Sequence, residues 1–354
     1  MPAGGLRHPF DRWTRPTLEW GVLQVGLIGL GVHGRRYVRH LSEGVPGMRL
    51  VAVCRRHGTE AERIGRELGI KAYSDAAALI DDREVQAVLI VTPPPSHLVL
   101  AAACLERGKP VLLEKPLTQT LGEAHDLLTM VTRAGIPLFL GQTLRYNAAL
   151  VLARRELRRI GAIRAITASQ RLPHAGLSWQ NSDSTHPLGS ILNTGVHLFD
   201  LVRWMFGLEF DRVYCQTHRV ENPFHEDLFK VQATLQNHDA LVALEVAKCT
   251  DSRSSNLEIV GAQGQLWVDY QMDSVTLLQG HERTVLREPD PVLTLPRMLA
   301  DFAHHYEHGE PMPITALDGV RTLEVVEACY RSLSENRPEP VGRPHLVDPP
   351  IPND

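Results

Sequence analysis

The sequence is poor in cysteine and has no strong charge of either sign, and these absences exclude several classes of protein. Its five cysteines are odd in number and include no Cys-x-x-Cys pair, which argues against a disulfide framework or a zinc ribbon and favours a reducing compartment. A net charge of −4 gives no reason to expect binding to nucleic acid or to an anionic membrane. No run of about 18 apolar residues occurs, so we expect no membrane-spanning helix and a cytoplasmic location.

Lysine is also scarce, since only five of the 37 basic residues are lysines. Lysine differs from arginine in being able to lose its proton within a protein. A lysine in this arginine-rich background is therefore of interest wherever a proton must move. The five are Lys71, Lys109, Lys115, Lys230 and Lys248.

The motifs of several other enzyme classes are missing as well. The sequence has neither a Walker-type phosphate loop nor the G-x-S-x-G turn of serine hydrolases. His304 and His308 have the i,i+4 spacing of a metal pair, but His305 stands where an H-E-x-x-H motif needs glutamate. We therefore predict no metal site.

Between about residues 23 and 142, short apolar runs alternate with helical segments. The runs LQVGLIG, MRLVAV, QAVLIV, PVLLE and IPLFLG are typical of buried parallel strands. Helical segments lie between them, for example over 59–68, 96–107 and 121–134. Repeated β-α-β units predict a doubly wound parallel sheet with helices on both faces, which is a Rossmann domain.

A different pattern follows residue 146. Short apolar segments at 162–171 and between 210 and 288 are joined by turns such as 237–239, which predicts an α/β domain with an open, mainly antiparallel sheet. Its helices are expected over 147–160, 193–206, 295–308 and 317–336. We thus divide the chain into a flexible extension (1–21), a Rossmann domain (22–145), a second α/β domain (146–337) and a Pro-rich tail (338–354).

The first apolar run leads directly into the turn Gly29-Leu30-Gly31-Val32-His33-Gly34, which matches G-x-G-x-x-G. Gly29 allows the tight turn, Gly31 lets the backbone approach a pyrophosphate, and Gly34 lets helix and strand pack closely. A helix that begins at Val32 would direct backbone N–H groups at the phosphates. The turn predicts a dinucleotide site in which Val32 and His33 also take part.

The end of the second strand bears on the choice between NAD and NADP. An acidic residue is expected there to bind the adenosine ribose of NAD, but this sequence has Cys54, Arg55 and Arg56. Guanidinium groups can bind a 2′-phosphate that a carboxylate would repel. We expect these three residues at the cofactor and favour NADP, with NAD as the alternative.

Four motifs in order resemble the glucose-fructose oxidoreductase/inositol dehydrogenase/MocA family of NAD(P)-dependent oxidoreductases. After the glycine turn come TPPPSH at 92–97 and EKP at 114–116. NTGVHLFD at 193–200 then resembles the family's D-x-G-x-H-x-x-D helix. The resemblance runs from about residue 22 to residue 340.

The resemblance implies roles for several residues. In this family the lysine of E-K-P is usually catalytic, and its bond to proline is often cis, so Lys115 would relay the substrate's hydroxyl proton. His197 would be the acid/base, and Asn193 and Asp200, on the same side of the helix, would orient the two groups. The remaining cofactor contacts would be Thr92, Pro93, His97, Glu114 and Lys115 itself.

The sequence also departs from the family. Asn193 stands where the dehydrogenases usually have Asp, and an amide cannot stabilise an imidazolium as a carboxylate does, so His197 should be the weaker base. Lys115 would then carry more of the proton transfer, or the reaction would run chiefly as reduction. Gln180 after Trp179 replaces a family arginine within the polar loop 172–189, which we expect to select the substrate.

The resemblance implies hydride transfer between NAD(P) and a secondary alcohol or ketone of a sugar, cyclitol or related polyol. Two alternatives remain open: an NAD-dependent glycoside hydrolase of the same family, and a non-catalytic protein that senses a cofactor or ligand. Since family members associate through the exposed face of the second sheet, we expect a homo-oligomer, either a dimer or a tetramer.

Overall fold

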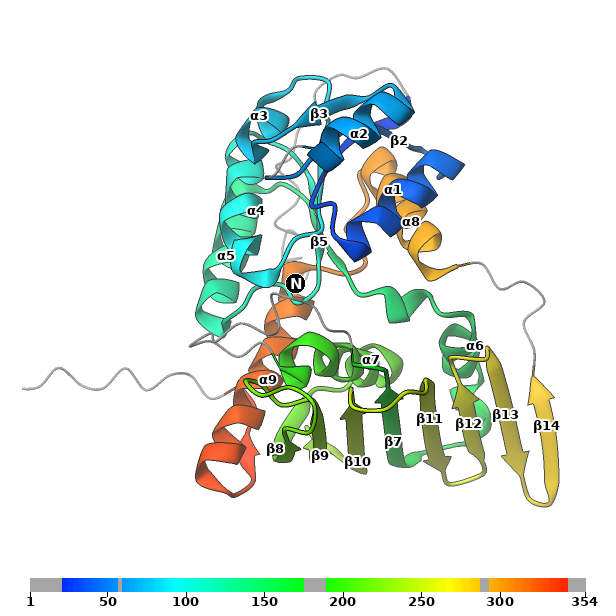
Figure 1. The fold of residues 1–354 in the computed structure, drawn as a ribbon. Coiled ribbons are helices and arrows are strands. Elements are labelled where there is room, and N and C mark those ends of the chain that lie inside the picture. Colours follow the sequence, from blue (N-terminus) through cyan, green and yellow to red (C-terminus); the bar gives the residue numbers. More distant parts are fainter. Residues whose placement is uncertain (1–20, 57–58, 175–188, 287–292, 343–354) are drawn as a thin grey trace, which may run out of the picture.

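The structure, a computed structural model, describes residues 21–56, 59–174, 189–286 and 293–342. Residues 1–20 of the predicted N-terminal extension, most of the loop 172–189 with Trp179 and Gln180, and most of the Pro-rich tail lie outside the described residues. Within these residues, no helix combines the length and apolar character that crossing a membrane requires. The described chain forms two sheets, each with its own helices, that lie one above the other in Figure 1.

The first sheet has six parallel strands in the order β3-β2-β1-β4-β5-β6. They are β1 (Leu23–Ile28), β2 (Met48–Cys54), β3 (Lys71–Tyr73), β4 (Ala87–Ile90), β5 (Val111–Glu114) and β6 (Leu138–Gly141). This order confirms the predicted doubly wound fold. Strand order reverses between β1 and β4, and ligands of such sheets bind at the carboxyl ends of the strands beside this point.

Helices cover both faces of the first sheet. They are α1 (Val32–Glu43), α2 (Thr59–Leu68), α3 (Ala76–Asp81), α4 (His97–Glu106), α5 (Leu121–Ala134) and α8 (Thr294–His308). In Figure 1, α3, α4 and α5 lie on one side, and α1 and α8 lie on the other. Although α8 comes late in the sequence, its Phe302 packs edge-on against Phe139 of β6, with ring centroids 5.7 Å apart. A helix from the last part of the chain thus packs against the first sheet, although the predicted boundary at residue 145 places this helix in the second domain.

The second sheet has nine strands in the order β14-β13-β12-β11-β7-β10-β9-β8-β15. They are β7 (Ile163–Arg171), β8 (Phe210–His218), β9 (Leu228–Leu235), β10 (His238–Ala247), β11 (Ser254–Gly261), β12 (Gln265–Asp269), β13 (Ser274–Gln279), β14 (Glu282–Leu286) and β15 (Glu339–Pro340). Only β7 and β10 pair in parallel, so the predicted mainly antiparallel sheet is confirmed. The segment assigned to the Pro-rich tail begins with regular structure, because β15 pairs with β8.

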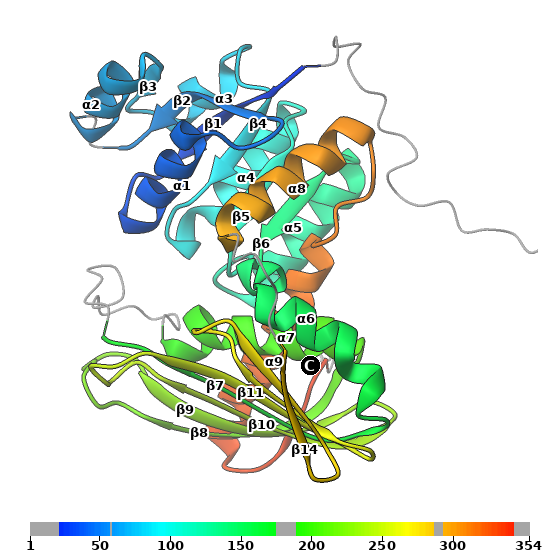
Figure 2. The same cartoon turned by 90° about the vertical axis from the view of Figure 1, so that its right-hand side faces the viewer.

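The second sheet has one packed face and one open face. Along β9, Phe229 and Val231 are buried while Lys230 and Gln232 are exposed, as alternating side chains on a half-covered sheet require. The helices α6 (Ala148–Glu156) and α7 (Val196–Phe206) lie over the packed face, as Figure 2 shows, and α9 (Ala316–Glu335) packs against β8. No described helix covers the opposite face.

The helix expected over 193–206 differs in its first turn. Residues Ile191–Gly195 form a π-helical turn, η5, and the α-helix begins only at Val196. Glu226 anchors this turn, because its carboxylate accepts from Ile191 N (3.0 Å) and from the Tyr330 hydroxyl (2.9 Å). Gly195 is needed because a β-carbon there would come within 2.9 Å of the Phe229 ring. Wide turns of this kind often lie at functional sites.

Candidate active site

The predicted glycine turn has the backbone geometry that a dinucleotide site needs. Gly29 has a φ of +104°, a conformation that disfavours residues with a β-carbon. A β-carbon on Gly34 would collide with the Gly29 carbonyl, so this glycine allows α1 to pack on β1. A β-carbon on Gly31, in contrast, would meet nothing within 4 Å, so open space lies over this residue. The turn is therefore closed toward the protein and open toward a ligand.

The N-terminus of α1 has the donors that a pyrophosphate requires. Gly31 caps the helix without any side-chain hydrogen bond, so no side chain competes for the first backbone N–H groups. Val32 is 67% exposed beside them, and the His33 side chain is 41% exposed. These residues fit the diphosphate of NAD or NADP.

The end of β2 presents two cations and no carboxylate of its own. Arg55 and Arg56 are exposed, while Cys54 is buried and its carbonyl accepts from Gly29 N (3.0 Å). Burial raises the pKa of the Cys54 thiol to about 11, so it stays neutral and unreactive. Cys54 thus supports the glycine turn through its backbone, and the two arginines are the groups that can contact a ligand.

The segment after β4 divides into exposed and buried residues. Pro93 is exposed and Thr92 is half-buried, as cofactor contacts would be. His97, predicted to contact the cofactor, is instead fully buried, and its ring nitrogens lie 2.8 Å from the carbonyl oxygens of Thr92 and Pro116. Its role is to join this segment to the Lys115–Pro116 loop, so its assignment as a cofactor contact is corrected.

Glu114, at the end of β5, is a buried carboxylate that organises one side of the site. It accepts from Tyr37 OH (2.5 Å) and Lys115 N (3.1 Å), and its Oε1 lies 2.7 Å from His33 Nε2. Although burial raises its pKa, His33 and Lys115 lower the pKa of Glu114 to about 2. It is therefore ionised at all ordinary pH values and ties the glycine turn to Lys115.

Lys115 points from the first sheet toward the second domain. It follows β5, and its bond to Pro116 is cis, as the family resemblance implied. Its Nζ donates to the backbone oxygen of Asn193 (2.8 Å) and approaches Asn193 Oδ1 (3.3 Å). Burial lowers the pKa of Lys115, and Glu114 opposes this only in part. The predicted meeting of Lys115 and Asn193 is thus present.

His197 lies in the same cluster, in the first turn of α7. Burial and the nearby charge of Lys115 lower its pKa well below the usual value, so the ring is neutral at physiological pH. Its Nδ1 lies 3.1 Å from Oε1 of Gln142, the residue that follows β6. Sequence reasoning missed Gln142, although a polar residue at the carboxyl end of a parallel strand was a signal that could have identified it.

A second lysine contributes to the charge at this site. Lys248 follows β10, and its backbone N–H donates to Asp227 O (2.7 Å). Burial and the charge of Lys115 lower the pKa of Lys248 to about 8. The scarcity of lysine drew attention to Lys248, but nothing in its local sequence connected it with Lys115.

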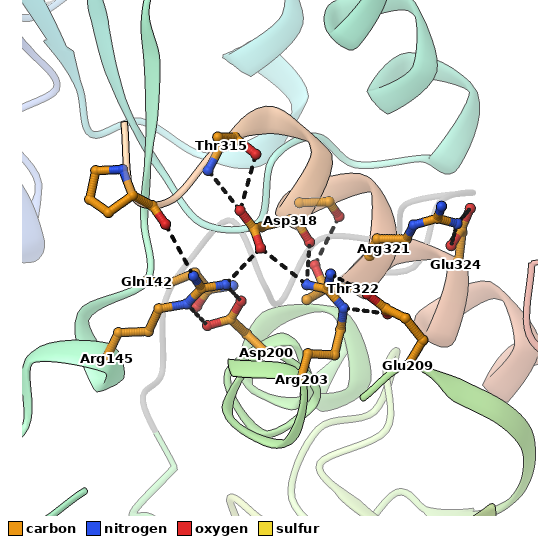
Figure 3. Close-up of polar contacts among 12 residues, drawn as sticks. Gln142, Arg145, Asp200, Arg203, Glu209, Thr315, Asp318, Arg321, Thr322 and Glu324 are labelled. Atoms are coloured by element: carbon orange, nitrogen blue, oxygen red, sulfur yellow. Dashed lines mark hydrogen bonds and ion pairs between the residues drawn. The ribbon is translucent and has the colours of Figure 1, made fainter. Parts of the chain in front are cut away.

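Asp200 has a different role from the predicted one. Its carboxylate is 1% exposed and binds Arg145 through Nε (2.8 Å) and Nη2 (2.5 Å), so it does not orient Lys115 or His197 directly. Arg145 also binds Asp318 of α9 (2.9 Å), and Arg203 joins Asp318 to Glu209. Figure 3 shows this cluster where the segment after β6 meets α7 and α9. The ion pairs hold the helix that carries His197.

The arrangement suits the removal of a proton from a hydroxyl group. Two nitrogen bases with lowered pKa values lie together at the carboxyl end of a sheet whose glycine turn fits a dinucleotide. Among the described residues, no group of His, Cys, Asp and Glu side chains could hold a metal ion. The bases and the dinucleotide site together supply what the oxidation of an alcohol requires.

Comparisons with known proteins agree with this geometry. A family model described as "Oxidoreductase family, NAD-binding Rossmann fold" matches residues 23–142, and its companion, "Oxidoreductase family, C-terminal alpha/beta domain", matches residues 154–342. Inositol 2-dehydrogenase 2 of Saccharopolyspora erythraea is 30% identical over 331 residues, which cover 90% of this chain and 95% of that protein.

Two further relatives show how far the similarity extends. The scyllo-inositol 2-dehydrogenase (NAD(+)) of Bacillus subtilis is 27% identical over 332 residues, or 89% of this chain and 95% of that protein. The crystal structure of an oxidoreductase domain protein from Kribbella flavida superimposes with a TM-score of 0.82 at 23% identity, covering 91% of this chain and 100% of that one. The fold is thus shared over both domains.

Proposed function

Since this chain belongs to the GFO/IDH/MocA family of oxidoreductases, we propose that it is a dehydrogenase that transfers a hydride between NAD(P) and a secondary alcohol or ketone. The substrate is a sugar, a cyclitol or a related polyol, a class supported by the names of the Saccharopolyspora erythraea and Bacillus subtilis relatives. The observation that carries the proposal is the meeting of Lys115, Asn193 and His197 beside the dinucleotide site.

Each residue of the site has a role in the oxidation of an alcohol. The bound cofactor supplies the hydride acceptor. A neutral Lys115 amine has two N–H groups, and both can be directed at the two Asn193 oxygens, which leaves its lone pair free to take the hydroxyl proton. His197, with Nδ1 facing Gln142, keeps Nε2 free for the same proton. The lowered pKa values of Lys115 and His197 place both groups closer to their basic forms at neutral pH.

Restoring a carboxylate at position 193 should shift the pH dependence of this reaction. In Asn193→Asp, a negative charge near Nζ favours the ammonium form and therefore raises the pKa of Lys115. The free amine then exists only at higher pH, so the acidic limb of kcat/KM for alcohol oxidation moves to higher pH. The pH–rate profiles of both enzymes measure this shift. As a control, Asn237→Asp in the β9–β10 turn adds the same charge far from the site and should leave the pH–rate profile unchanged. If the acidic limb of the profile did not move in Asn193→Asp, Lys115 would not be the base.

The exposed arginines after β2 support a preference for NADP over NAD. Their guanidinium groups match a 2′-phosphate, whereas the Bacillus subtilis relative is named for NAD(+). We expect Arg55→Ala/Arg56→Ala to lower the affinity for NADPH by about 10- to 100-fold and to change that for NADH little. Fluorescence titration measures both affinities, with the exposed Arg133→Ala as a control. An equal loss of affinity for both cofactors would mean that the arginines contact a part of the cofactor that NAD and NADP share.

The open face of the second sheet supports self-association as a dimer or tetramer. Leu241 of β10 is 65% exposed and Trp267 of β12 is 43% exposed, and the strands β11 and β7 lie between them in the sheet. Apolar groups of this kind favour burial in an interface. Light scattering after gel filtration measures the mass of the assembly, and a monomer at micromolar concentration would refute the proposal.

A reducing compartment such as the cytoplasm also fits the chain. All five cysteines are free thiols, and four of them are buried. Reduced cysteines are the rule where glutathione and thioredoxin operate. We therefore retain a cytoplasmic location as part of the proposal.

A substrate screen tests the proposed activity. The inositol stereoisomers and a set of aldoses, each supplied with NAD⁺ or NADP⁺, should include at least one compound that gives net nicotinamide reduction. A protein that retains its dinucleotide through purification and cleaves a glycoside without net reduction would instead be the hydrolytic member of the family. Binding of a polyol without turnover under any condition would favour the non-catalytic alternative.

A further inference from the structure

We propose that Gln142 is a positioning residue that fixes which ring nitrogen of His197 carries the proton. By accepting from Nδ1–H, Gln142 leaves Nε2 unprotonated and able to take the hydroxyl proton of the substrate. The inference deepens the proposed dehydrogenase function and rests on it for the identity of that proton.

Gln142 is held firmly enough to orient a neighbour. Its side chain is 1% exposed, and it directly follows β6 at the carboxyl end of the first sheet. Its backbone N–H donates to Leu140 O (2.9 Å), and its carbonyl accepts from Arg145 N (3.2 Å). Arg145 is itself bound to Asp200 of α7, the helix that carries His197. Gln142 and His197 are therefore fixed in relation to each other.

The surroundings of the Gln142 amide determine which end faces His197. Nε2 lies 3.5 Å from Val196 O, a long contact, but one that only an N–H group can make favourably with a carbonyl oxygen. The opposite orientation would bring Oε1 toward that oxygen and create a repulsive contact. Oε1 therefore faces His197 Nδ1, at 3.1 Å.

An acceptor opposite Nδ1 decides the tautomer of a neutral imidazole. Such a ring has one N–H group, and its position follows from the hydrogen bond that the ring makes. With the proton on Nδ1, the lone pair lies on Nε2. This is the tautomer that a general base acting through Nε2 requires.

The amide also accounts for how the ring stays neutral. The titratable groups that face His197 are Lys115 and Glu114, from the end of β5, and His33, from α1. A carboxylate at position 142 would hold Nδ1–H equally well, but it would also stabilise the imidazolium. Glutamine orients the ring without adding charge, so His197 remains a base at neutral pH.

Two substitutions at position 142 separate the effect of orienting the His197 ring from the effect of placing a charge beside it. Gln142→Met keeps the length of the side chain but removes the acceptor, so we expect His197 to populate both tautomers and kcat to fall on the order of 100-fold. Gln142→Glu keeps the acceptor and adds a charge, so the Nδ1–H tautomer remains while the pKa of His197 rises. The acidic limb of the kcat profile then moves to higher pH. Gln271→Met, an exposed residue in the β12–β13 turn, should match the wild type in every measurement.

Nitrogen NMR of ¹⁵N-histidine-labelled protein reports the tautomer directly, with the His197 signals assigned as those lost in His197→Asn. The proposal predicts Nδ1–H in the wild type and a mixture in Gln142→Met, with unchanged cofactor affinity and thermal unfolding as evidence of an intact fold. An Nε2–H tautomer in the wild type, or an unchanged tautomer and pH profile in Gln142→Met, would overturn it. Because the NMR measurement needs no substrate, it separates failure of this proposal from failure of the proposed function.

Discussion

Replacing Lys115 by methionine is expected to lower kcat by about 10²- to 10⁴-fold, which is the range that a general base contributes. Methionine keeps most of the apolar stem but has no proton to exchange. The methionine side chain would still fill the space that the lysine stem occupies, so the affinity for cofactor should change little. Steady-state rates and fluorescence titration of NAD(P)H measure the two effects separately.

The Lys115→Arg variant shows whether Lys115 acts by accepting a proton or only by supplying a positive charge. Arginine keeps the positive charge but does not give up its proton in a protein. We expect it to lose alcohol oxidation as completely as Lys115→Met does. Lys71→Met, an exposed lysine on β3 that pairs with Asp82 and Glu84, is the matched control and should retain full activity. Substantial activity in Lys115→Arg would mean that Lys115 acts through its charge, and that His197 can accept the hydroxyl proton without a second base.

Arg145→Met should have the largest effect on stability, with a loss of about 3–5 kcal/mol. Asp200 is buried, the Arg145 side chain is only 10% exposed, and Asp318 shares the same guanidinium group, an arrangement of contacts that Figure 3 shows. Burial already raises the pKa of Asp200 despite Arg145, so removing the cation leaves a carboxylate that cannot easily stay charged. The midpoints of urea and thermal unfolding measure the loss.

A double mutant tests whether the unpaired carboxylate is the cause. Arg145→Met/Asp200→Asn removes the buried charge and should recover part of the lost stability. Arg63→Met breaks an exposed ion pair on α2 and should leave both midpoints nearly unchanged. If Arg145→Met unfolded at the wild-type midpoint, the cluster would not secure the helix that carries His197.

Most of the first sheet could be predicted because buried parallel strands are continuous apolar runs, and helices with polar faces separate them. The exception was β3, whose Lys71 and Ala72 are exposed at the sheet edge, so its three residues have no apolar pattern. The second sheet was predictable from alternation, because only one of its faces is covered. The packing of α8 on the first sheet could not be predicted, because the pattern of an amphipathic helix does not show which surface the helix packs against.

The site was predictable at the level of motifs but not of contacts. The family resemblance assigned Lys115, Asn193 and His197 to one site, but it did not identify Gln142, which lies 55 positions from His197 in the sequence. Motif matching also could not separate exposed from buried residues, so His97 was assigned to the cofactor. The π turn at Asn193 depends on Glu226, a tertiary contact with no local signal.

Transfer of deuterium tests the central claim most directly. Myo-inositol, or the first polyol that the screen identifies, is supplied with deuterium on every carbon together with NAD⁺ or NADP⁺, and the reduced cofactor is analysed by mass spectrometry. The account predicts one deuterium in each reduced nicotinamide, because the side chains of Lys115 and His197 exchange only the hydroxyl proton. Loss of that deuterium to solvent, with product formed, would mean that a side chain removes the proton from carbon and would contradict direct hydride transfer.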